Sequence, residues 1–146
     1  MKIERANAKI NLYLDVLNKR EDGYHNIKSV MQSVSLCDEI ALEITDVQGE
    51  NEIEIICSDD RLKCDKSNLI YKAWFKFFDA TKILGKRCVF TLKKNIPMAA
   101  GMAGGSSDCA CALSLLNEAF ACPLSYEELV LLGSKIGADV AFCIKG

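Results

Sequence analysis

Apolar and polar residues alternate strictly along residues 8–17, AKINLYLDVL. Four apolar side chains fall on one side of this alternation, and they are Ile10, Leu12, Leu14 and Val16. A period of two is typical of a β-strand with one face against a core and the other in water. The segment therefore predicts a half-buried strand that carries Lys9 and Asn11 together on its polar face.

Further strands are expected along the chain, separated by polar turns. The segment 18–23 ends in Asp22-Gly23, a pair that favours a tight turn. The segments that we expect to be extended are residues 24–36, 39–45, 52–57 and 87–93. The polar stretch 46–50 predicts a turn between the second and third of these.

The spacing of apolar residues becomes helical after the first four expected strands. Apolar residues recur three and four apart in residues 65–84 and again in residues 108–121, which predicts two helices. Asp65 or Ser67 is expected to cap the first of them. A glycine-rich stretch separates the second helix from the strand before it.

Ser125 and Glu128 have the spacing of a capping box and predict a third helix, ending near Gly133 or Gly137. The chain contains no internal repeat, low-complexity segment or linker. Strands come first and helices interleave later, which is typical of an α+β fold. We therefore expect one α+β domain over residues 1–146.

Charge and hydropathy exclude several classes of partner. The 18 basic and 20 acidic residues leave a formal net charge of −2, which gives no general attraction to nucleic acid or to an anionic membrane. No stretch approaches the ~20 consecutive apolar residues that a membrane-spanning helix needs. The composition is that of a soluble globular protein.

The eight cysteines are expected to be small core residues rather than ligands or disulfides. No two of them form a C-x-x-C pair, and His25 is the one histidine, so a zinc site is not expected. The N-terminus lacks the apolar region of a secretory signal. A reducing cytoplasm is the expected location.

The stretch 97–108, PMAAGMAGGSSD, is the strongest candidate for chemistry. It joins a predicted strand to a predicted helix, and its glycines allow several backbone N–H groups to approach one point. The helix behind it adds free N–H groups and the positive end of its dipole. The segment matches neither a Walker A loop nor a Rossmann fingerprint. It predicts a polyphosphate-binding loop, and the alternative is a mobile turn.

The spacing P-x-x-x-G-x-x-G-G-S-S-D resembles the ATP-binding motif of the galactokinase, homoserine kinase, mevalonate kinase and phosphomevalonate kinase (GHMP) superfamily. Residues 8–27 and 136–146 resemble two signatures of one family within it, the 4-diphosphocytidyl-2-C-methyl-D-erythritol kinases of the non-mevalonate isoprenoid pathway. The resemblance covers nearly the whole chain. It implies the α+β fold of the ribosomal protein S5 domain 2-like kind, in the N-terminal domain of these kinases.

The same resemblance implies phosphoryl transfer from ATP, with Mg²⁺, to the 2-hydroxyl of the cytidylyl substrate. It makes Lys9 and Asp139 the catalytic pair. The substrate-binding positions that it implies are Asn11, Tyr24 and His25, with the tyrosine ring stacked on the cytosine. The positions that it implies for ATP are Asn68, Lys94, Pro97, Met98, Ala99, Ala100, Gly101, Met102, Ala103, Gly104, Gly105, Ser106 and Ser107.

Taken without the resemblance, Lys9 is expected to be solvated and Asp139 to be a turn or cap residue. The sequence also departs from the family, because Ala141 stands where proline is usual and the loop reads GMAGG where GLGGG or GLAGG is usual. These kinases carry a second, C-terminal domain that residues 1–146 do not include. We therefore expect little or no turnover from residues 1–146 alone.

Three other functions remain open at this point. A related kinase could act on homoserine or mevalonate, although the Tyr24-His25 pair favours a cytidylyl substrate. The chain could also be a nucleotide-binding module without turnover. An RNA-binding domain on the same fold is disfavoured by the net charge of −2.

Overall fold

A four-stranded sheet covered by helices forms the protein, as seen in a computed structural model that describes residues 2–19, 21, 23 and 25–146. The elements in chain order are β1 (Lys2–Lys19), β2 (His25–Asp46), β3 (Glu52–Cys57), α1 (Leu69–Thr81), β4 (Lys86–Lys93), α2 (Gly104–Ala119), α3 (Tyr126–Ser134) and α4 (Val140–Lys145). The mixture confirms the predicted α+β class.

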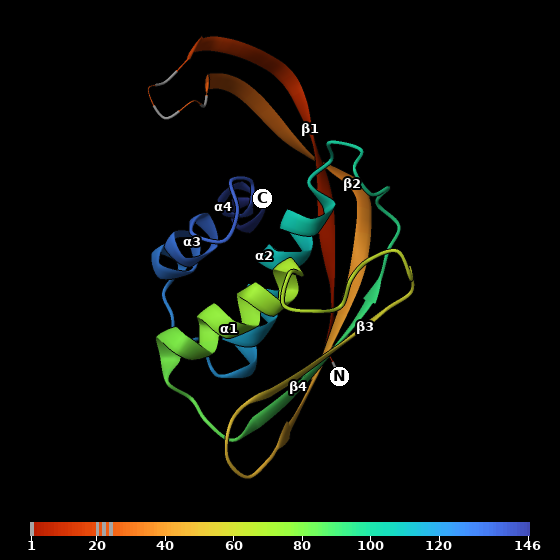
Figure 1. Ribbon diagram of the computed structural model, residues 1–146, viewed down its shortest axis with the longest axis vertical. Coiled ribbons are helices and arrows are strands. Elements are labelled where there is room, and N and C mark those ends of the chain that lie inside the picture. Colours follow the sequence, from red (N-terminus) through yellow and green to blue (C-terminus); the bar gives the residue numbers. More distant parts are fainter. Residues whose placement is uncertain (1, 20, 22, 24) are drawn as a thin grey trace.

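The strands lie in the order β1-β2-β4-β3. The β1–β2 and β2–β4 pairs are antiparallel, whereas β3 and β4 are parallel. Parallel neighbours need a crossover between them, and α1 provides it. Figure 1 shows the helices gathered on one side of the sheet, with α1 and α2 lying against it. The other side of the sheet has no helix over it in this view.

The core fills the space between the helices and the inner face of the sheet. Ile40 on β2 and Phe90 on β4 are fully buried, as are Phe77 on α1 and Leu113 and Leu116 on α2. Alternate residues of β4 are buried, as expected of a strand with one covered face. Helix α2 packs against both β1 and α1, so its position is fixed from two sides.

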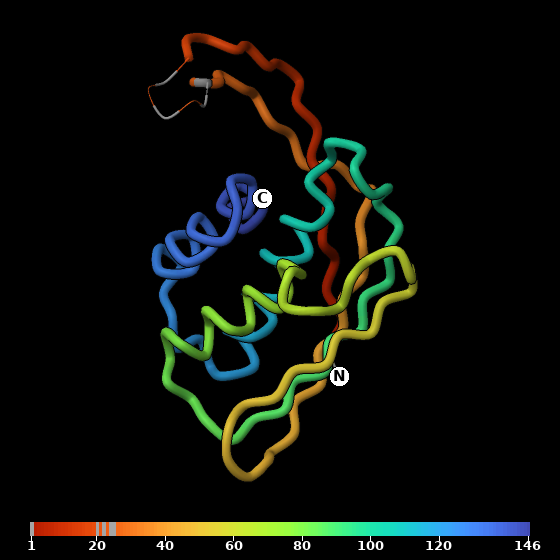
Figure 2. Tube along the Cα trace, in the orientation of Figure 1, coloured from red at the N-terminus to blue at the C-terminus, as the bar shows by residue number. Residues whose placement is uncertain are grey.

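The prediction of a half-buried strand at residues 8–17 is wrong about which side chains are covered. Leu12, Leu14 and Val16 are all more than half exposed, whereas Lys9 is buried. The reason is that β1 and β2 continue beyond the rest of the sheet as a two-stranded arm, visible at the top of Figures 1 and 2. Their pairing there continues from Lys9–Ser33 to Lys19–His25, where neither β3 nor β4 is paired with them.

The remaining element predictions are confirmed in kind and corrected at their ends. The segments 24–36 and 39–45 belong to one continuous strand, β2. Helix α2 begins at Gly104, four residues before the predicted start, because the glycine-serine run is itself helical. The capping box of Ser125 and Glu128 is present. The C-terminal helix α4 was not predicted.

Helix α1 is capped by Asn68 rather than by Asp65 or Ser67. The side-chain oxygen of Asn68 accepts a hydrogen bond from the N–H of Ile70 at 2.9 Å, and its amide donates to the carbonyl of Lys63 at 2.8 Å. Asp65 instead accepts from the backbone N–H of Ser67 and closes a local turn before the helix.

Replacing Asn68 with Ala is expected to lower the free energy of unfolding by ~1 kcal/mol, the usual effect of losing an N-cap. Ser67→Ala is the matched control and is expected to have a smaller effect, because Ser67 does not cap the helix. Chemical denaturation of both variants measures the difference. Equal destabilisation by the two changes would contradict the assignment of the cap.

The cysteines divide into three groups by exposure, and Cys37, Cys57 and Cys143 form the intermediate one. Cys88, Cys109 and Cys111 are buried, as expected, and burial raises the pKa of each thiol to about 12. Cys64 and Cys122 are exposed, contrary to the expectation that all were core residues. All eight are free thiols. Within the described residues, no helix is long and apolar enough to cross a membrane.

Candidate functional site

The glycine-rich loop leaves β4 and enters α2 through a strained path. Ala99, Gly101 and Ala103 all adopt left-handed backbone conformations, with φ values of 57°, 73° and 57°. Such conformations are rare for alanine because its Cβ crowds the backbone. Ala103 is the N-cap residue of α2 and has no side-chain oxygen, so no side-chain cap bonds the amides of the first turn. The loop therefore presents a helix N-terminus with free donors.

A pocket of about 360 Å³ lies within this loop. The loop positions predicted to bind ATP line it from Pro97 to Ser106, together with Lys94 and Asp108, whereas Ser107, also predicted, does not. A second cavity of about 370 Å³ adjoins it at the start of α1 and contains Asn68. Leu69, Gly105 and Asp108 line both cavities, so the two form neighbouring parts of one region.

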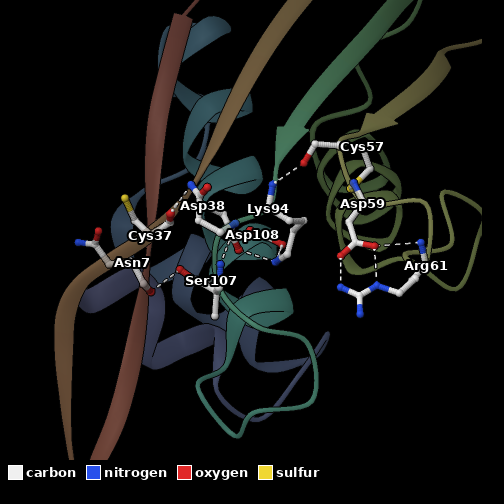
Figure 3. Close-up of polar contacts among 12 residues, drawn as sticks. Asn7, Cys37, Asp38, Cys57, Asp59, Arg61, Lys94, Ser107 and Asp108 are labelled. Atoms are coloured by element: carbon white, nitrogen blue, oxygen red, sulfur yellow. Dashed lines mark hydrogen bonds and ion pairs between the residues drawn. The ribbon is translucent and has the colours of Figure 1, made fainter.

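Two hydrogen bonds tie the loop and its helix to β1. The backbone N–H of Lys9 donates to the carbonyl of Met102 at 3.0 Å. The hydroxyl of Ser107 donates to the carbonyl of Asn7 at 2.6 Å, as Figure 3 shows. Ser107 is buried and is not among the residues that line either cavity. Its hydroxyl holds the helix to the strand.

Lys9 and Asp139 come together although they lie near opposite ends of the chain. Their Nζ and Oδ2 atoms are 3.5 Å apart, with 7% of the Lys9 side chain and 37% of the Asp139 side chain exposed. The Lys9 ammonium also donates to Oδ1 of Asn11 at 3.4 Å, and the hydroxyl of Ser29 donates to the same oxygen. Lys9 is thus a buried, paired lysine and not the solvated strand residue expected from its position alone.

Asp139 occupies the N-cap position of α4, as one reading of the sequence expected, but its carboxylate makes no capping bond within the described residues. The carboxylate is therefore available to Lys9 and to solvent. The turn before α4 lies against the phosphate loop, since a Cβ added at Gly137 would be 4.0 Å from the hydroxyl oxygen of Ser106. The Lys9–Asp139 pair consequently stands beside the start of α2.

Lys94 forms a buried charge cluster with two aspartates that were given no role from the sequence. Its Nζ is ion-paired with Oδ2 of Asp38 and lies 2.9 Å from Oδ2 of Asp108. The side chains of all three residues are at most 6% exposed. The other oxygen of Asp38 accepts from the N–H groups of Asn95 and Ile96 at 2.5 and 2.8 Å. Figure 3 shows the three side chains close together next to the loop.

The cluster has unusual protonation behaviour. Burial raises the pKa of Asp108 to about 7, although the neighbouring Lys94 ammonium acts to lower it. Burial acts to lower the pKa of Lys94, but the charges and hydrogen bonds of the two carboxylates outweigh it and raise that pKa. The stability that a neutral Asp108 contributes is complete below pH 3.8 and is lost as the pH rises through about 7.

Two predicted substrate residues cannot be compared with the structure. Tyr24 lies outside the described residues, and the backbone of His25 begins β2 while its side chain lies outside the description. Asn11, the third of these residues, is exposed on the arm and bonded to Lys9.

Residues 68–146 match the family described as GHMP kinases N terminal domain, and the chain belongs to this family. The 4-diphosphocytidyl-2-C-methyl-D-erythritol kinase of Clostridium beijerinckii is 47% identical over 146 residues, which are 100% of this chain and 50% of that protein. The kinase of the same name from Clostridium kluyveri is 46% identical over 142 residues, 97% of this chain and 49% of that protein. The chain spans about half the length of the curated relatives it matches.

Solved structures agree with this family. The crystal structure of a 4-(cytidine 5'-diphospho)-2C-methyl-D-erythritol kinase matches with a TM-score of 0.81 at 31% identity, over 99% of this chain and 49% of that chain. The mevalonate kinase of Methanococcus jannaschii matches with a TM-score of 0.67 at 14% identity, over 97% of this chain and 46% of that one. The second likeness is one of fold alone, and together they confirm the fold that the resemblance implied.

Proposed function

We propose that residues 1–146 are the ATP-binding domain of an enzyme that phosphorylates the 2-hydroxyl of 4-diphosphocytidyl-2-C-methyl-D-erythritol. The observation that carries the proposal is the Lys9–Asp139 pair beside a helix N-terminus with free donors. The names and identities of the curated relatives support the choice of substrate. The reaction belongs to the non-mevalonate route to isoprenoids.

The loop and helix α2 hold the phosphates of ATP. The amides at the start of α2 donate to phosphate oxygens, and the helix dipole favours their negative charge. The neighbouring cavity at Asn68 receives the adenosine part, because it adjoins the loop pocket. Asn68 shapes this cavity through the helix that it caps, since both its oxygen and its amide are already bonded.

Asp139 is the general base, and Lys9 orients it. The substrate hydroxyl loses its proton to the Asp139 carboxylate as its oxygen bonds to the γ-phosphorus. The bond from that phosphorus to the bridging oxygen of ADP breaks in the same displacement. The Lys9 ammonium pairs with the Asp139 carboxylate and stabilises negative charge on the transferring group. Asn11, which accepts a hydrogen bond from Lys9, contacts the substrate in this proposal.

Magnesium is proposed to arrive with the nucleotide and not to occupy a protein cage. The described residues contain no group of three or more acidic, cysteine or histidine side chains able to hold a metal ion. Mg²⁺ commonly binds through substrate phosphates and water with few protein ligands. The proton transfer proposed above depends on the side chains of Asp139 and Lys9.

Binding experiments test the proposal. The protein is expected to bind a non-hydrolysable ATP analogue and, separately, a CDP-linked ligand. Tyr24→Ala is expected to weaken the CDP-linked ligand about tenfold, since a base–aromatic stack contributes ~1–3 kcal/mol, while the ATP analogue keeps its affinity. Calorimetric titration measures both.

Tyr13→Ala is the matched control, because Tyr13 is an exposed tyrosine on β1. It is expected to leave both affinities unchanged. Equal weakening of both ligands by Tyr24→Ala would contradict the cytosine assignment. Failure of the unaltered protein to bind any nucleotide would contradict the proposed function itself.

A further inference from the structure

The cluster of Asp38, Lys94 and Asp108 lies at the point where both ends of the phosphate loop meet the sheet. Lys94 precedes the loop and Asp108 follows it in the second turn of α2, so their 2.9 Å contact closes the loop at its base. Asp38, on β2, accepts hydrogen bonds from the backbone N–H groups of Asn95 and Ile96, the two residues after Lys94. Figure 3 shows these side chains pointing toward one another.

The charges of the cluster do not balance. Two carboxylates face one ammonium, so the fully ionised cluster carries one excess negative charge. That charge is almost fully removed from solvent and lies in the wall of the loop pocket, where Lys94 and Asp108 are both lining residues. A buried charge of this sign opposes the binding of a polyphosphate in the same pocket.

Hydrogen bonding singles out Asp108 as the group that takes a proton. Both oxygens of Asp38 have partners, namely two amides and Lys94. Oδ1 of Asp108 is buried and has no hydrogen-bond partner among the described residues. Besides burial, the charge of Asp38 also raises the pKa of Asp108. A neutral Asp108 can donate to Asp38 while its other oxygen still accepts from Lys94.

Other titratable groups near Asp108 do not compensate this charge. Cys109 and Cys111 on α2 and Cys143 on α4 have pKa values raised by burial to about 12, 12 and 11, and so stay neutral. Lys9 on β1 is paired with Asp139. Lys72 of α1 forms no ion pair with Asp108 in the described structure. The net charge at the base of the loop therefore depends on Asp38, Lys94 and Asp108.

We propose that Asp108 is a positioning residue of the phosphate site and that it becomes protonated when the loop binds a polyphosphate, so that nucleotide binding takes up a proton. The inference rests on the proposed function of the loop. Protonation removes the excess charge behind the phosphates and keeps the Lys94 contact that closes the loop. The site thus binds nucleotide best in the form in which the cluster is neutral.

The experiment measures proton uptake by calorimetry in HEPES and in Tris at one pH near 7.5, with a non-hydrolysable ATP analogue as the probe. The unaltered protein is expected to take up a substantial fraction of one proton per nucleotide. Its affinity is expected to fall as the pH rises above 7, by up to about tenfold per unit. Asp108→Asn mimics the neutral form and is expected to remove both the uptake and the pH dependence.

Asp65→Asn is the matched control, because Asp65 is an exposed aspartate that caps a local turn before α1. It is expected to keep the proton uptake of the unaltered protein. Protons taken up by the phosphates of the ligand contribute equally in the unaltered protein, Asp108→Asn and Asp65→Asn. A difference in proton uptake between the unaltered protein and Asp108→Asn is therefore due to Asp108. Adenosine, which lacks phosphates, is expected to bind without uptake.

Uptake that is equal in the unaltered protein and in Asp108→Asn would overturn the inference. So would binding without proton uptake in the unaltered protein, a result that does not depend on whether the variant folds. Either result leaves the proposed function intact, since nucleotide still binds. Absence of binding by both the ATP analogue and inorganic triphosphate would instead overturn the proposed function, and this inference with it.

Discussion

Asp139→Asn is expected to reduce kcat by roughly 10²–10⁴-fold, the range found for removal of a general base. The substitution keeps the size of the side chain and removes its charge, so the partner of Lys9 remains in place but cannot accept a proton. The KM for ATP is expected to change little, because Asp139 is not among the residues that line the loop pocket. A coupled ADP-release assay measures both quantities.

The assay needs an enzyme that joins residues 1–146 to a second half like that of the relatives, because the chain spans about half of their length. Asp65→Asn in the same enzyme is the control for loss of an acidic residue. Unchanged kcat in Asp139→Asn would remove Asp139 from the mechanism. It would also leave the Lys9–Asp139 ion pair with a structural role alone.

Gly104→Val is expected to weaken binding of an ATP analogue by about 100-fold or more. A Cβ at this position would lie 3.2 Å from Nζ of Lys94 and 3.2 Å from Cγ2 of Ile96, closer than ordinary contacts. The Lys94 ammonium cannot move away freely because Asp38 and Asp108 hold it. The loop must therefore shift, and overpacking of this kind costs ~1–3 kcal/mol in addition to the lost phosphate contacts.

Gly105→Ala is the matched control for this change. A Cβ at Gly105 would lie 3.6 Å from Leu69, an ordinary contact, so the loop keeps its path and the loss of nucleotide affinity is expected to be much smaller than in Gly104→Val. Thermal unfolding of both variants separates loss of binding from loss of the fold. A folded Gly104→Val protein with normal affinity would show that the phosphates do not depend on the path of this loop.

Local signals explain what could be predicted from the sequence. The glycine-serine run between a strand and a helix marks the loop by composition alone, and Ser125 with Glu128 marks a helix start by spacing alone. The loop residues from Pro97 to Ser106 line one pocket, whereas Ser107, predicted with them, is bonded to β1. Their roles in binding ATP stay predictions.

Long-range contacts explain what could not be predicted. The burial of Lys9 depends on Asp139 near the other end of the chain, and the exposure of Leu12 depends on where the sheet stops. In the sequence Asp38 is an ordinary polar residue of a strand. Its partners, the Lys94 ammonium and the two backbone N–H groups after it, lie more than 50 positions away along the chain. Neither the spacing of apolar residues nor the secondary-structure propensity of a segment predicts such long-range contacts.

The ion pair between β1 and α4 also has a consequence for the order in which the protein folds. Contacts between residues so far apart in sequence require closure of a long loop, whose entropic cost must be offset by other contacts. The hydrogen bonds within α2 are local and can form early, and the phosphate loop needs only β1 and β2 besides, whereas the pair of Lys9 and Asp139 also requires that α4 has docked. During synthesis the chain would therefore acquire a nucleotide site before it acquires the acid–base pair beside it.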